Sequence, residues 1–440
     1  MNSDGLKVVL QEFRARTLPQ GMRRDQDLPT DSGKVVALAG LRRSGKTFLF
    51  FQAIEALVAR GVPRERILYL NFEDDRLHPL RAEELDLVLR CQRELFAEAR
   101  TGRLYVFLDE VHSAPGWERW VRRLHDTEDV SLFVTGSSSA LLGRDLSSAL
   151  RGRSITLEVF PLSFREYLAF LAIEVVPFDA GSESEVKAAL ADYLQWGGFP
   201  EVVLAAPEMR PLILEEYSSL MLWRDLVERH GLRNEALMRA LLRHCFRNTA
   251  TLMSLAKLHR DLGSQGVSVS RVTLHDYVDI LVDAGLIHLL PVIGDSARKA
   301  ARNPRKLHVG DPGLITAFKA GGARDFGHKL ETAVFLQARR SGRDWRYVPG
   351  DGEVDLCNAE GTRFVNSCWR LVEEPTLERE VAALAFARRS LPNATGALLY
   401  HDAPVDIGAR SESARPAWRW LLEQPSGPFT GRLPPLSPSP

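Results

Sequence analysis

The sequence predicts an α/β protein built on a parallel sheet, followed by a helical segment and a C-terminal α/β domain. Between residues 35 and 157, short apolar runs alternate with longer amphipathic stretches. The runs are VVALAG, ILYLNFE, LYVFLDE, SLFVTGS and SITLEVF, and the stretches between them include Phe48–Arg60, Glu83–Arg100 and Trp117–His125. Continuous apolar strands separated by helices indicate a parallel sheet covered on both faces, here of about five strands.

Past this sheet the strand pattern fades, residues 164–286 are mainly helical in pattern, and a mixed α/β pattern returns between residues 307 and 399. At 440 residues, two or three domains are expected. The expected parts are an N-terminal segment (1–34), the sheet core (35–162), a helical lid or linker (163–236), a winged-helix segment (237–320), a C-terminal α/β domain (321–405) and a tail (406–440) with a disordered, Pro- and Ser-rich end.

Composition excludes several classes of protein. The 57 basic and 57 acidic residues cancel, so net charge favours neither nucleic acid nor a membrane as partner. No apolar run approaches the roughly 18 residues that a membrane-spanning helix needs, so no membrane association is expected. The four cysteines, Cys91, Cys245, Cys357 and Cys368, form no CxxC pair. This spacing argues against a zinc site or a disulfide framework and predicts a reducing, cytoplasmic location.

The segment GLRRSGKT, Gly40–Thr47, fits the phosphate-binding pattern G-x-x-x-x-G-K-[ST] between the first strand and an apolar helix. In such a loop backbone N–H groups and the helix N-terminus face phosphate oxygens. Lys46 is expected to reach the β- and γ-phosphates, and the Thr47 hydroxyl to bind Mg²⁺. The predicted nucleotide-binding residues are Gly40, Leu41, Arg42, Arg43, Ser44, Gly45, Lys46 and Thr47. ATP and Mg²⁺ are the expected cofactors. The loop contacts the phosphates and not the base, so it does not distinguish ATP from GTP.

Two acids follow the strand LYVFLDE, at the edge of a parallel sheet where ligands bind. We expect Asp109 to act on the Mg²⁺ side of the nucleotide, and Glu110 to orient or deprotonate the attacking water. A strand that ends in Asp-Glu is common by itself. Its position after the phosphate-binding loop favours the functional interpretation.

The middle segment has the order helix, short turn, helix, hairpin, which is typical of a winged helix-turn-helix. Leu252–Gly263 is the first predicted helix, and Gly285 is the expected C-cap of the second. The hairpin carries the basic run RKAARNPRK, with Arg298, Lys299, Arg302, Arg305 and Lys306. These residues are predicted to contact phosphates of double-stranded DNA without reading bases. The alternative is a lid on the sheet core with a solvated basic hairpin.

The ordered motifs resemble a known family. They are GLRRSGKT, ILYLNFEDDRL, VFLDEVHSAPGWERWVRRL, FVTGSSSALL, ALRGR, PLSFREYL, YLQWGGFPEV, KLHVGDPGLITAF and GHKLETAVFLQARRSG. Together they resemble the prokaryotic AAA-type ATPases that pair an AAA_14 domain with a DUF4143 domain. The resemblance implies an archaeal or bacterial ATPase with a winged-helix segment and a C-terminal fold related to PD-(D/E)xK nucleases.

The resemblance also implies two further functional positions. Thr135 or Ser137, after the strand SLFVTGS, is expected to sense the γ-phosphate, whereas the alternative is a helix N-cap. Arg151 or Arg153 lies where AAA proteins keep an arginine finger that reaches a neighbouring subunit, which predicts a homo-oligomer. The alternative is a solvated helix C-terminus, where arginine is also favoured.

The nuclease pattern of the C-terminal domain is incomplete. Glu331 falls on a predicted helix, and Glu353 and Asp355 on the strand GEVDL. The expected [E/Q]-x-K falls on residues 366–368, where an amide replaces the acid and a thiol replaces the lysine. Without these groups phosphodiester hydrolysis is not expected. Glu331 and Asp355 are candidates for weak binding of a hard cation. The retained fold is expected to serve as a docking or nucleic-acid-facing surface, and the alternative for Glu353 and Asp355 is ordinary alternation on a half-exposed strand.

The sequence therefore predicts an ATP hydrolase whose nucleotide state moves a winged-helix and nuclease-like module on DNA. An alternative is a slow ATP-dependent switch that acts on a protein partner without a role on DNA. A third is a nuclease gated by ATP.

Overall fold

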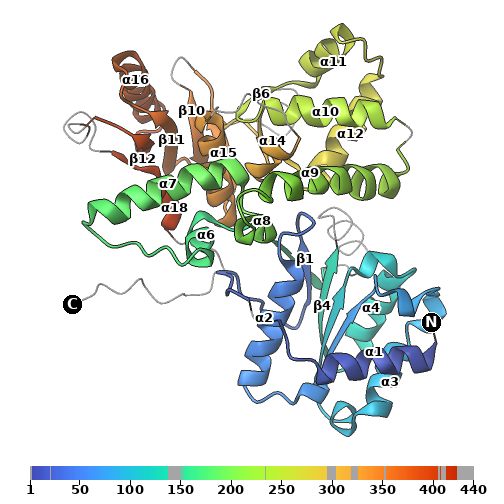
Figure 1. Cartoon of the computed structure of the whole chain (residues 1–440). Helices are drawn as coiled ribbons and strands as arrows, with labels where there is room; N and C mark the ends of the chain where they lie inside the picture. Colours follow the sequence, from blue (N-terminus) through green and yellow to red (C-terminus); the bar gives the residue numbers. More distant parts are fainter. Residues whose placement is uncertain are drawn as a thin grey trace. The chain divides into compact units, whose positions relative to one another are not determined.

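The computed structural model describes residues 2–19, 21–136, 150, 152–232, 234–294, 304–318, 326–350, 353–404, 407 and 413–423. The chain divides into two compact units, Met1–Val159 and Phe160–Pro440. Figure 1 shows the helices and strands of each unit.

Five parallel strands form the centre of the first unit, which confirms the predicted sheet. They are β1 (Val35–Ala39), β2 (Ile67–Asn71), β3 (Leu104–Asp109), β4 (Val130–Gly136) and β5 (Ser154–Glu158), in the order β2-β3-β4-β1-β5. Every residue of β1 is buried, as expected of a strand covered on both faces. Because β4 lies between β3 and β1, the C-terminal ends of these three strands meet at one edge of the sheet.

Helices cover this sheet (Figure 1). They are α1 (Ser3–Ala15), α2 (Lys46–Ala59), α3 (Leu87–Leu95) and α4 (Trp117–Thr127), with short 3₁₀ segments at Arg64–Arg66, Asp75–Leu77, Ala82–Glu84, Ala97–Arg100 and Val111–Ser113. No helix was predicted where α1 lies. It begins at Asn2, whose side chain accepts a hydrogen bond from the Asp4 N–H, and it buries Leu6 and Leu10 in the core of this unit.

The second unit begins with helices. They are α6 (Phe164–Phe170), α7 (Ala180–Trp196), α8 (Pro200–Leu204), α9 (Arg210–Leu220), a π-helix (Met221–Glu228) and α10 (Glu235–Arg247). α7 stops at Gly197, where a Cβ atom would lie 1.9 Å from Asp311 Oδ1. The Asp311 carboxylate accepts hydrogen bonds from the N–H groups of Gly198 at 2.9 Å and Gly313 at 2.8 Å. The Gly-Gly interruption therefore makes room for a buried aspartate from a distant segment.

A small antiparallel sheet with two helices follows. Its elements are β6 (Thr251–Met253), α11 (Leu255–Ser264), α12 (Arg271–Asp283), β7 (Ile287–Leu290) and β8 (Arg305–Val309), with strand order β6-β8-β7. The predicted order of helix, turn, helix and hairpin is present. The first helix starts three residues later than predicted because Ser254 caps it, accepting from the Lys257 N–H, and the residues before it form β6.

The C-terminal sheet has five strands in the order β13-β12-β11-β10-β9. Its elements are α14 (Gly313–Ala317), α15 (Phe326–Arg340), β9 (Trp345–Val348), β10 (Val354–Asn358), β11 (Arg363–Arg370), α16 (Glu374–Ser390), β12 (Thr395–Asp402), β13 (Ala414–Pro416) and α18 (Ala417–Leu422). Strands β9 to β11 are antiparallel, whereas β12 is parallel to β11 and follows α16. Both β13 and α18 fall in the segment predicted as a tail, where burial of Trp418 and Leu421 holds α18 in the fold.

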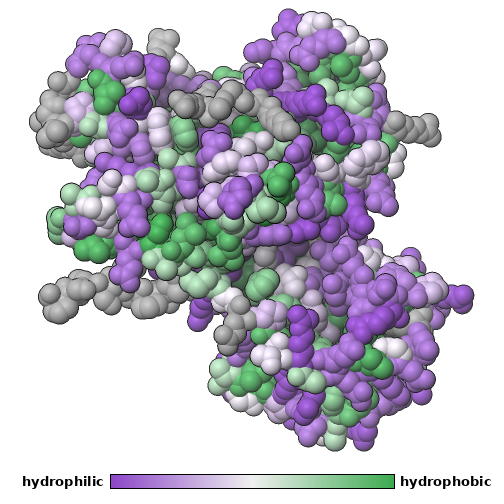
Figure 2. All heavy atoms as spheres, in the orientation of Figure 1, coloured by the Kyte–Doolittle hydropathy of each residue, from purple (hydrophilic) through white to green (hydrophobic). Residues whose placement is uncertain are grey.

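Figure 2 shows that hydrophilic residues cover most of the visible face of each unit, and that apolar residues occupy smaller areas. Within the described ranges, no helix is both long enough and apolar enough to span a bilayer.

Candidate nucleotide site

The phosphate-binding loop connects β1 to α2, as predicted. A Cβ atom at Gly40 would lie 2.1 Å from the carbonyl oxygen of Val159, so no side chain fits there. Gly45 has a φ of 100° and Arg43 a φ of 64°, both in the left-handed region. This backbone curls the loop, and α2 starts at Lys46. The loop and the helix N-terminus therefore form the kind of N–H-lined turn that receives phosphate oxygens.

Lys46 is buried within this loop, with 5% of its surface exposed. Its Nζ atom donates hydrogen bonds to the carbonyl oxygens of Gly40 at 3.1 Å and Leu41 at 3.0 Å. A second buried cation, Arg24, donates from Nη1 to the carbonyl oxygen of Ser44 at 2.8 Å. Arg24 lies in the segment before the sheet and was not among the predicted site residues. Its hydrogen bond to Ser44 ties this preceding segment to the loop.

Asp109 is the centre of a hydroxyl network at the end of β3. Its Oδ2 atom accepts hydrogen bonds from Thr47 Oγ1 at 2.7 Å and from the Tyr69 hydroxyl at 2.9 Å, and its Oδ1 atom accepts one from Thr135 Oγ1. These donors come from α2, β2 and β4. Thr47 and Asp109 together offer a hydroxyl and a carboxylate, which suits a hard cation such as Mg²⁺.

Glu110 directly follows Asp109 with a φ of 50°, a left-handed conformation that turns its side chain out of the strand. Its backbone N–H donates to Thr135 Oγ1 at 3.0 Å. Thr135 is fully buried, so its hydroxyl holds the two acids in place. Burial raises the pKa of Glu110, and Asp109 and Glu73 add to this effect against the opposing charges of Lys46 and Arg42. A carboxylate with a raised pKa suits proton abstraction from water.

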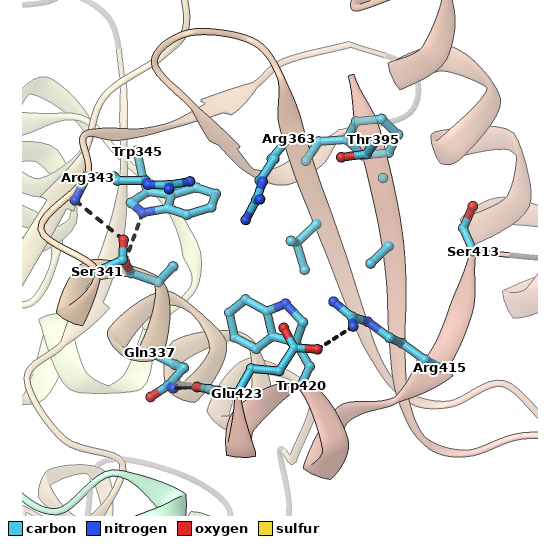
Figure 3. Close-up of a pocket in the computed structure, with 15 residues that line it drawn as sticks. Gln337, Ser341, Arg343, Trp345, Arg363, Thr395, Ser413, Arg415, Trp420 and Glu423 are labelled. Atoms are coloured by element: carbon cyan, nitrogen blue, oxygen red, sulfur yellow. Dashed lines mark hydrogen bonds and ion pairs between the residues drawn. The ribbon is translucent and has the colours of Figure 1, made fainter. Parts of the chain in front are cut away.

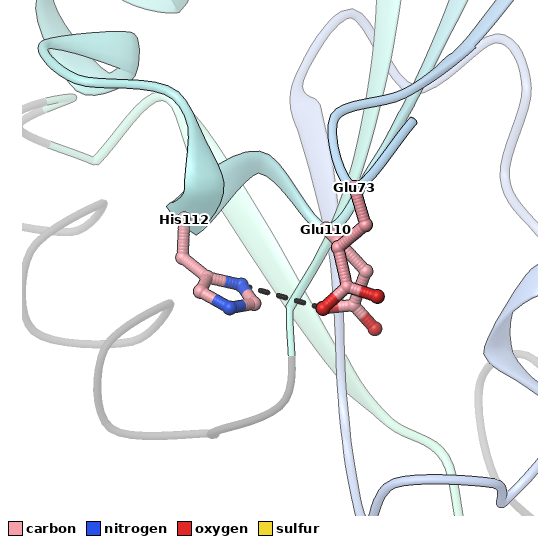
Figure 4. A group of neighbouring side chains, drawn as sticks. All are labelled: Glu73, Glu110 and His112. Carbon is pink, nitrogen blue, oxygen red and sulfur yellow. Dashed lines mark ion pairs between the residues drawn. The ribbon is translucent and has the colours of Figure 1, made fainter. Parts of the chain in front are cut away.

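Two further residues contact Glu110. His112 Nδ1 lies 3.3 Å from Glu110 Oε2, and Glu73 brings a third ligand-type atom, all within 4.8 Å of one another (Figure 4). Arg42 Nη2 is 3.7 Å from Glu73 Oε1. An imidazole beside carboxylates is a more typical ligand set for a transition metal than for Mg²⁺. Neither His112 nor Glu73 was among the predicted site residues, although the segment VFLDEVH contains the histidine.

Other predicted site residues lie elsewhere. Ser137 and Arg151 are outside the described residues. Arg153 precedes β5, and its Nε atom is 2.9 Å from Asp126 Oδ1. Ser154 pairs with Val35 at the start of β1, whereas the loop follows the end of that five-residue strand. At about 3.3 Å per residue, Arg153 is about 16 Å from its own loop along the strand. It cannot serve the site of its own chain.

One residue of the basic hairpin, Lys306, is buried and not exposed to DNA as predicted. Arg298, Lys299 and Arg302 are outside the described residues, and Arg305 is partly exposed on β8. Lys306 is only 2% exposed, and it is bound to carboxylates. The prediction that Lys306 contacts DNA is wrong, because both faces of β8 are covered from Lys306 onward and the Lys306 ammonium is enclosed by three carboxylates.

A separate cavity of about 470 Å³ lies in the C-terminal domain, between α15 and the strands β11 and β12 (Figure 3). Three arginines, Arg343, Arg363 and Arg415, line it. Arg415 Nη1 is 2.5 Å from Glu423 Oε1, so part of its charge is neutralised within the chain. The cavity contains none of the predicted site residues.

Two family models match the chain. One, described as an AAA domain (AAA_14), matches residues 32–168, and the other, a domain of unknown function (DUF8612), matches residues 187–325. The AAA match agrees with the resemblance drawn from the sequence. The expected DUF4143 domain is a misassignment, because the DUF8612 model covers that part of the chain.

Two solved structures are similar at low identity. The Aeropyrum pernix ORC1 protein in complex with DNA is 17% identical, with 72% of this chain and 91% of that chain covered and a TM-score of 0.31. AMPPCP-bound DnaA from Aquifex aeolicus is 13% identical, with 58% and 83% covered and a TM-score of 0.26. At these TM-scores the likeness says nothing about what this chain binds.

Two curated relatives span most of the chain. An uncharacterized protein of Haemophilus influenzae is 26% identical over 314 residues, which cover 71% of this chain and 76% of that protein. An uncharacterized protein of Methanocaldococcus jannaschii, MJ1544, is 30% identical over 435 residues, which cover 94% of each. This chain therefore belongs to the same family as MJ1544, and its first part is an AAA domain of the P-loop class.

Proposed function

We propose that the first unit binds Mg²⁺-ATP and hydrolyses it, and that the nucleotide state moves the second unit on DNA. The observation that carries the proposal is that Lys46 and Thr47, after β1, lie at the same edge of the sheet as Asp109 and Glu110, after β3, with Thr47 donating to Asp109. A P-loop alone is consistent with binding. The additional carboxylate of Glu110 is partly buried, and the backbone N–H of the same residue donates to Thr135 Oγ1; this second acid supports hydrolysis.

Each residue has a distinct role in the proposal. Lys46 leaves its carbonyl partners in the loop and turns to the β- and γ-phosphates. Thr47 Oγ1 and Asp109 hold the Mg²⁺ ion, which neutralises the charge that develops on the transferring phosphoryl group. Glu110 accepts a proton from the attacking water. Thr135 fixes the two acids, and this contact links the γ-phosphate side of the site to β4.

The role on DNA rests on the second unit. Helices α11 and α12 with the β7–β8 hairpin have the order of a winged helix-turn-helix, and basic residues precede and begin β8. Arg298, Lys299, Arg302 and Arg305 are the proposed phosphate contacts. Such contacts release counterions, so binding should weaken with salt and should not depend strongly on sequence.

The test is an ATPase assay on the full chain with and without double-stranded DNA. Lys46→Ala should abolish turnover and strongly weaken ATP binding, because it removes the charge that faces the phosphates. The matched control is Lys34→Ala. Lys34 lies just before β1, at the other end of the strand, where its Nζ atom donates to the carbonyl oxygen of Gly152 at 2.9 Å. Turnover that survives Lys46→Ala would contradict the assigned site.

The effect of DNA on turnover distinguishes the proposed function from the alternative. Stimulation of turnover by DNA supports the proposed ATPase whose nucleotide state moves the second unit on DNA. ATP binding with slow turnover that DNA leaves unchanged favours the alternative, a switch that assembles with a protein partner.

A further inference from the structure

A buried lysine lies among three carboxylates in the second unit. Lys306 Nζ is 2.6 Å from Glu331 Oε1, 2.6 Å from Glu353 Oε1 and 2.9 Å from Asp355 Oδ1. The lysine comes from β8, Glu331 from α15, and the other two acids from the start of β10 and the residue before it. The lysine side chain is 2% exposed and that of Glu331 10%, so water contributes little to their solvation.

The polar groups around this lysine are not fully satisfied. Lys306 donates hydrogen bonds to Glu353 and Asp355, and its ammonium also pairs with Glu331 Oε1. His308 Nε2, which is fully buried and 4.0 Å from that Glu331 oxygen, has no hydrogen-bond partner within the described part of the chain. A buried imidazole nitrogen of ligand type thus lies beside the carboxylate cluster. Such groups are costly unless a partner satisfies them.

The ammonium lies between the three carboxylates, where a single cation could contact all of them. Divalent cations take carboxylate oxygens at about 2.0–2.6 Å, and one ion bound to all three acids would have to lie almost where Nζ lies. The second oxygen of Asp355 is already fixed, because Oδ2 accepts from the Ser367 N–H at 2.9 Å. Asn366 holds the strands together, with Oδ1 accepting from the Asp355 N–H at 3.2 Å. The three acids are therefore arranged for a cation.

We propose that Glu331, Glu353 and Asp355 form a latent divalent-cation site that the Lys306 ammonium fills, so that this unit folds without a metal ion. The proposal is independent of the nucleotide site and goes beyond it. It also gives the β8 hairpin a function within the fold, since the internal cation anchors β8 to β10 and α15. Removing the ammonium should open the site to Mn²⁺ or Mg²⁺, because the three carboxylates would then need another cation.

The test measures Mn²⁺ binding to the nucleotide-free full chain by electron paramagnetic resonance. Lys306→Met keeps the length of the side chain and removes its charge. This variant should bind one Mn²⁺ per chain more than wild type, and Mn²⁺ should raise its melting temperature more than it raises that of wild type. Adding Asp355→Asn to Lys306→Met should remove the extra ion. The nucleotide site is unchanged in all these proteins, so any Mn²⁺ held by Thr47 and Asp109 cancels in the difference.

A folded Lys306→Met chain that gains no Mn²⁺ would overturn the proposal. Because loss of a buried partner can unfold a protein, Glu353→Gln in the wild-type background provides a second arm. Glu353 is the most exposed of the three acids, at 38%, so this change should be tolerated. Unchanged Mn²⁺ binding in Glu353→Gln supports a site already filled by lysine. Wild-type Mn²⁺ binding that falls in Glu353→Gln would mean that the acids hold metal beside the lysine, and the proposal would fail.

Discussion

Tyr69→Phe should lower the melting temperature of the first unit and raise the Mg²⁺ concentration that it needs for turnover. The Tyr69 hydroxyl donates to Asp109 Oδ2 at 2.9 Å, the same oxygen that accepts from Thr47. Its ring packs against Phe13 and Phe51 at centroid distances of 5.0 and 5.3 Å. Phenylalanine keeps this packing and removes only the hydroxyl. The change therefore isolates one hydrogen bond to a buried carboxylate.

The magnitude follows from the partner of that hydrogen bond. A hydrogen bond to a charged group contributes about 1.5–3 kcal/mol. For a unit of this size each kcal/mol shifts the melting temperature by about 2–4 °C, so a decrease of about 3–12 °C is expected. Partners that orient a metal ligand typically change metal affinity by about 10- to 100-fold when they are lost. The Mg²⁺ concentration needed for half-maximal turnover should rise by a factor in that range.

The assay compares Tyr69→Phe with Tyr105→Phe. Tyr105 lies on β3, pairs in register with Ile67 of β2, and its hydroxyl has no hydrogen-bond partner among the residues described. Thermal unfolding and ATP affinity are measured for both variants, with Mg²⁺ and with EDTA. Tyr69→Phe should lose affinity only in the presence of Mg²⁺. Equal melting temperatures and equal Mg²⁺ dependence in the two variants would refute the role assigned to the Tyr69 hydroxyl.

Three further predictions concern single residues. Glu110→Gln should bind ATP as wild type does but turn it over about 10²- to 10⁴-fold more slowly, because an amide accepts no proton; wild-type turnover would remove Glu110 from the mechanism. Arg153→Ala should lose turnover and regain part of it when mixed with Lys46→Ala, because a finger acts on the neighbouring subunit's nucleotide. Arg122→Ala, which removes another partner of Asp126, is its control; no recovery on mixing would leave Arg153 as a surface residue. Burial raises the pKa of Asp311 from 3.8 to about 7, so the folded state binds a proton at this carboxyl more tightly than the unfolded state does. The contribution of this proton to the free energy of unfolding is therefore present at low pH and is lost as pH rises through about 7. Asp311→Asn should flatten that fall in the free energy of unfolding between about pH 4 and 7, and equal slopes in the two proteins would contradict the assignment.

The sequence alone determined the features that depend on neighbouring residues. Gly40 to Thr47 follow a buried strand and begin a helix, and Asp109 with Glu110 ends another strand. Because parallel strands end at a common edge, these local patterns were enough to predict that the two segments meet. The five strands of the sheet followed from their apolar runs in the same way.

Tertiary structure decided the contacts between residues that are far apart along the chain. Tyr69 and Asp109 are separated by 40 positions, and Arg24 and Ser44 by 20, and no periodic pattern connects them. Lys306 is the clearest case in which the sequence was not enough, since it ends a basic run that was predicted to be exposed. Two of its three acids lie 47 and 49 positions away, at the start of β10, which no local pattern places beside β8. The pairing arises because a buried carboxylate cluster needs a cation, and only the folded chain determines which cation can reach it.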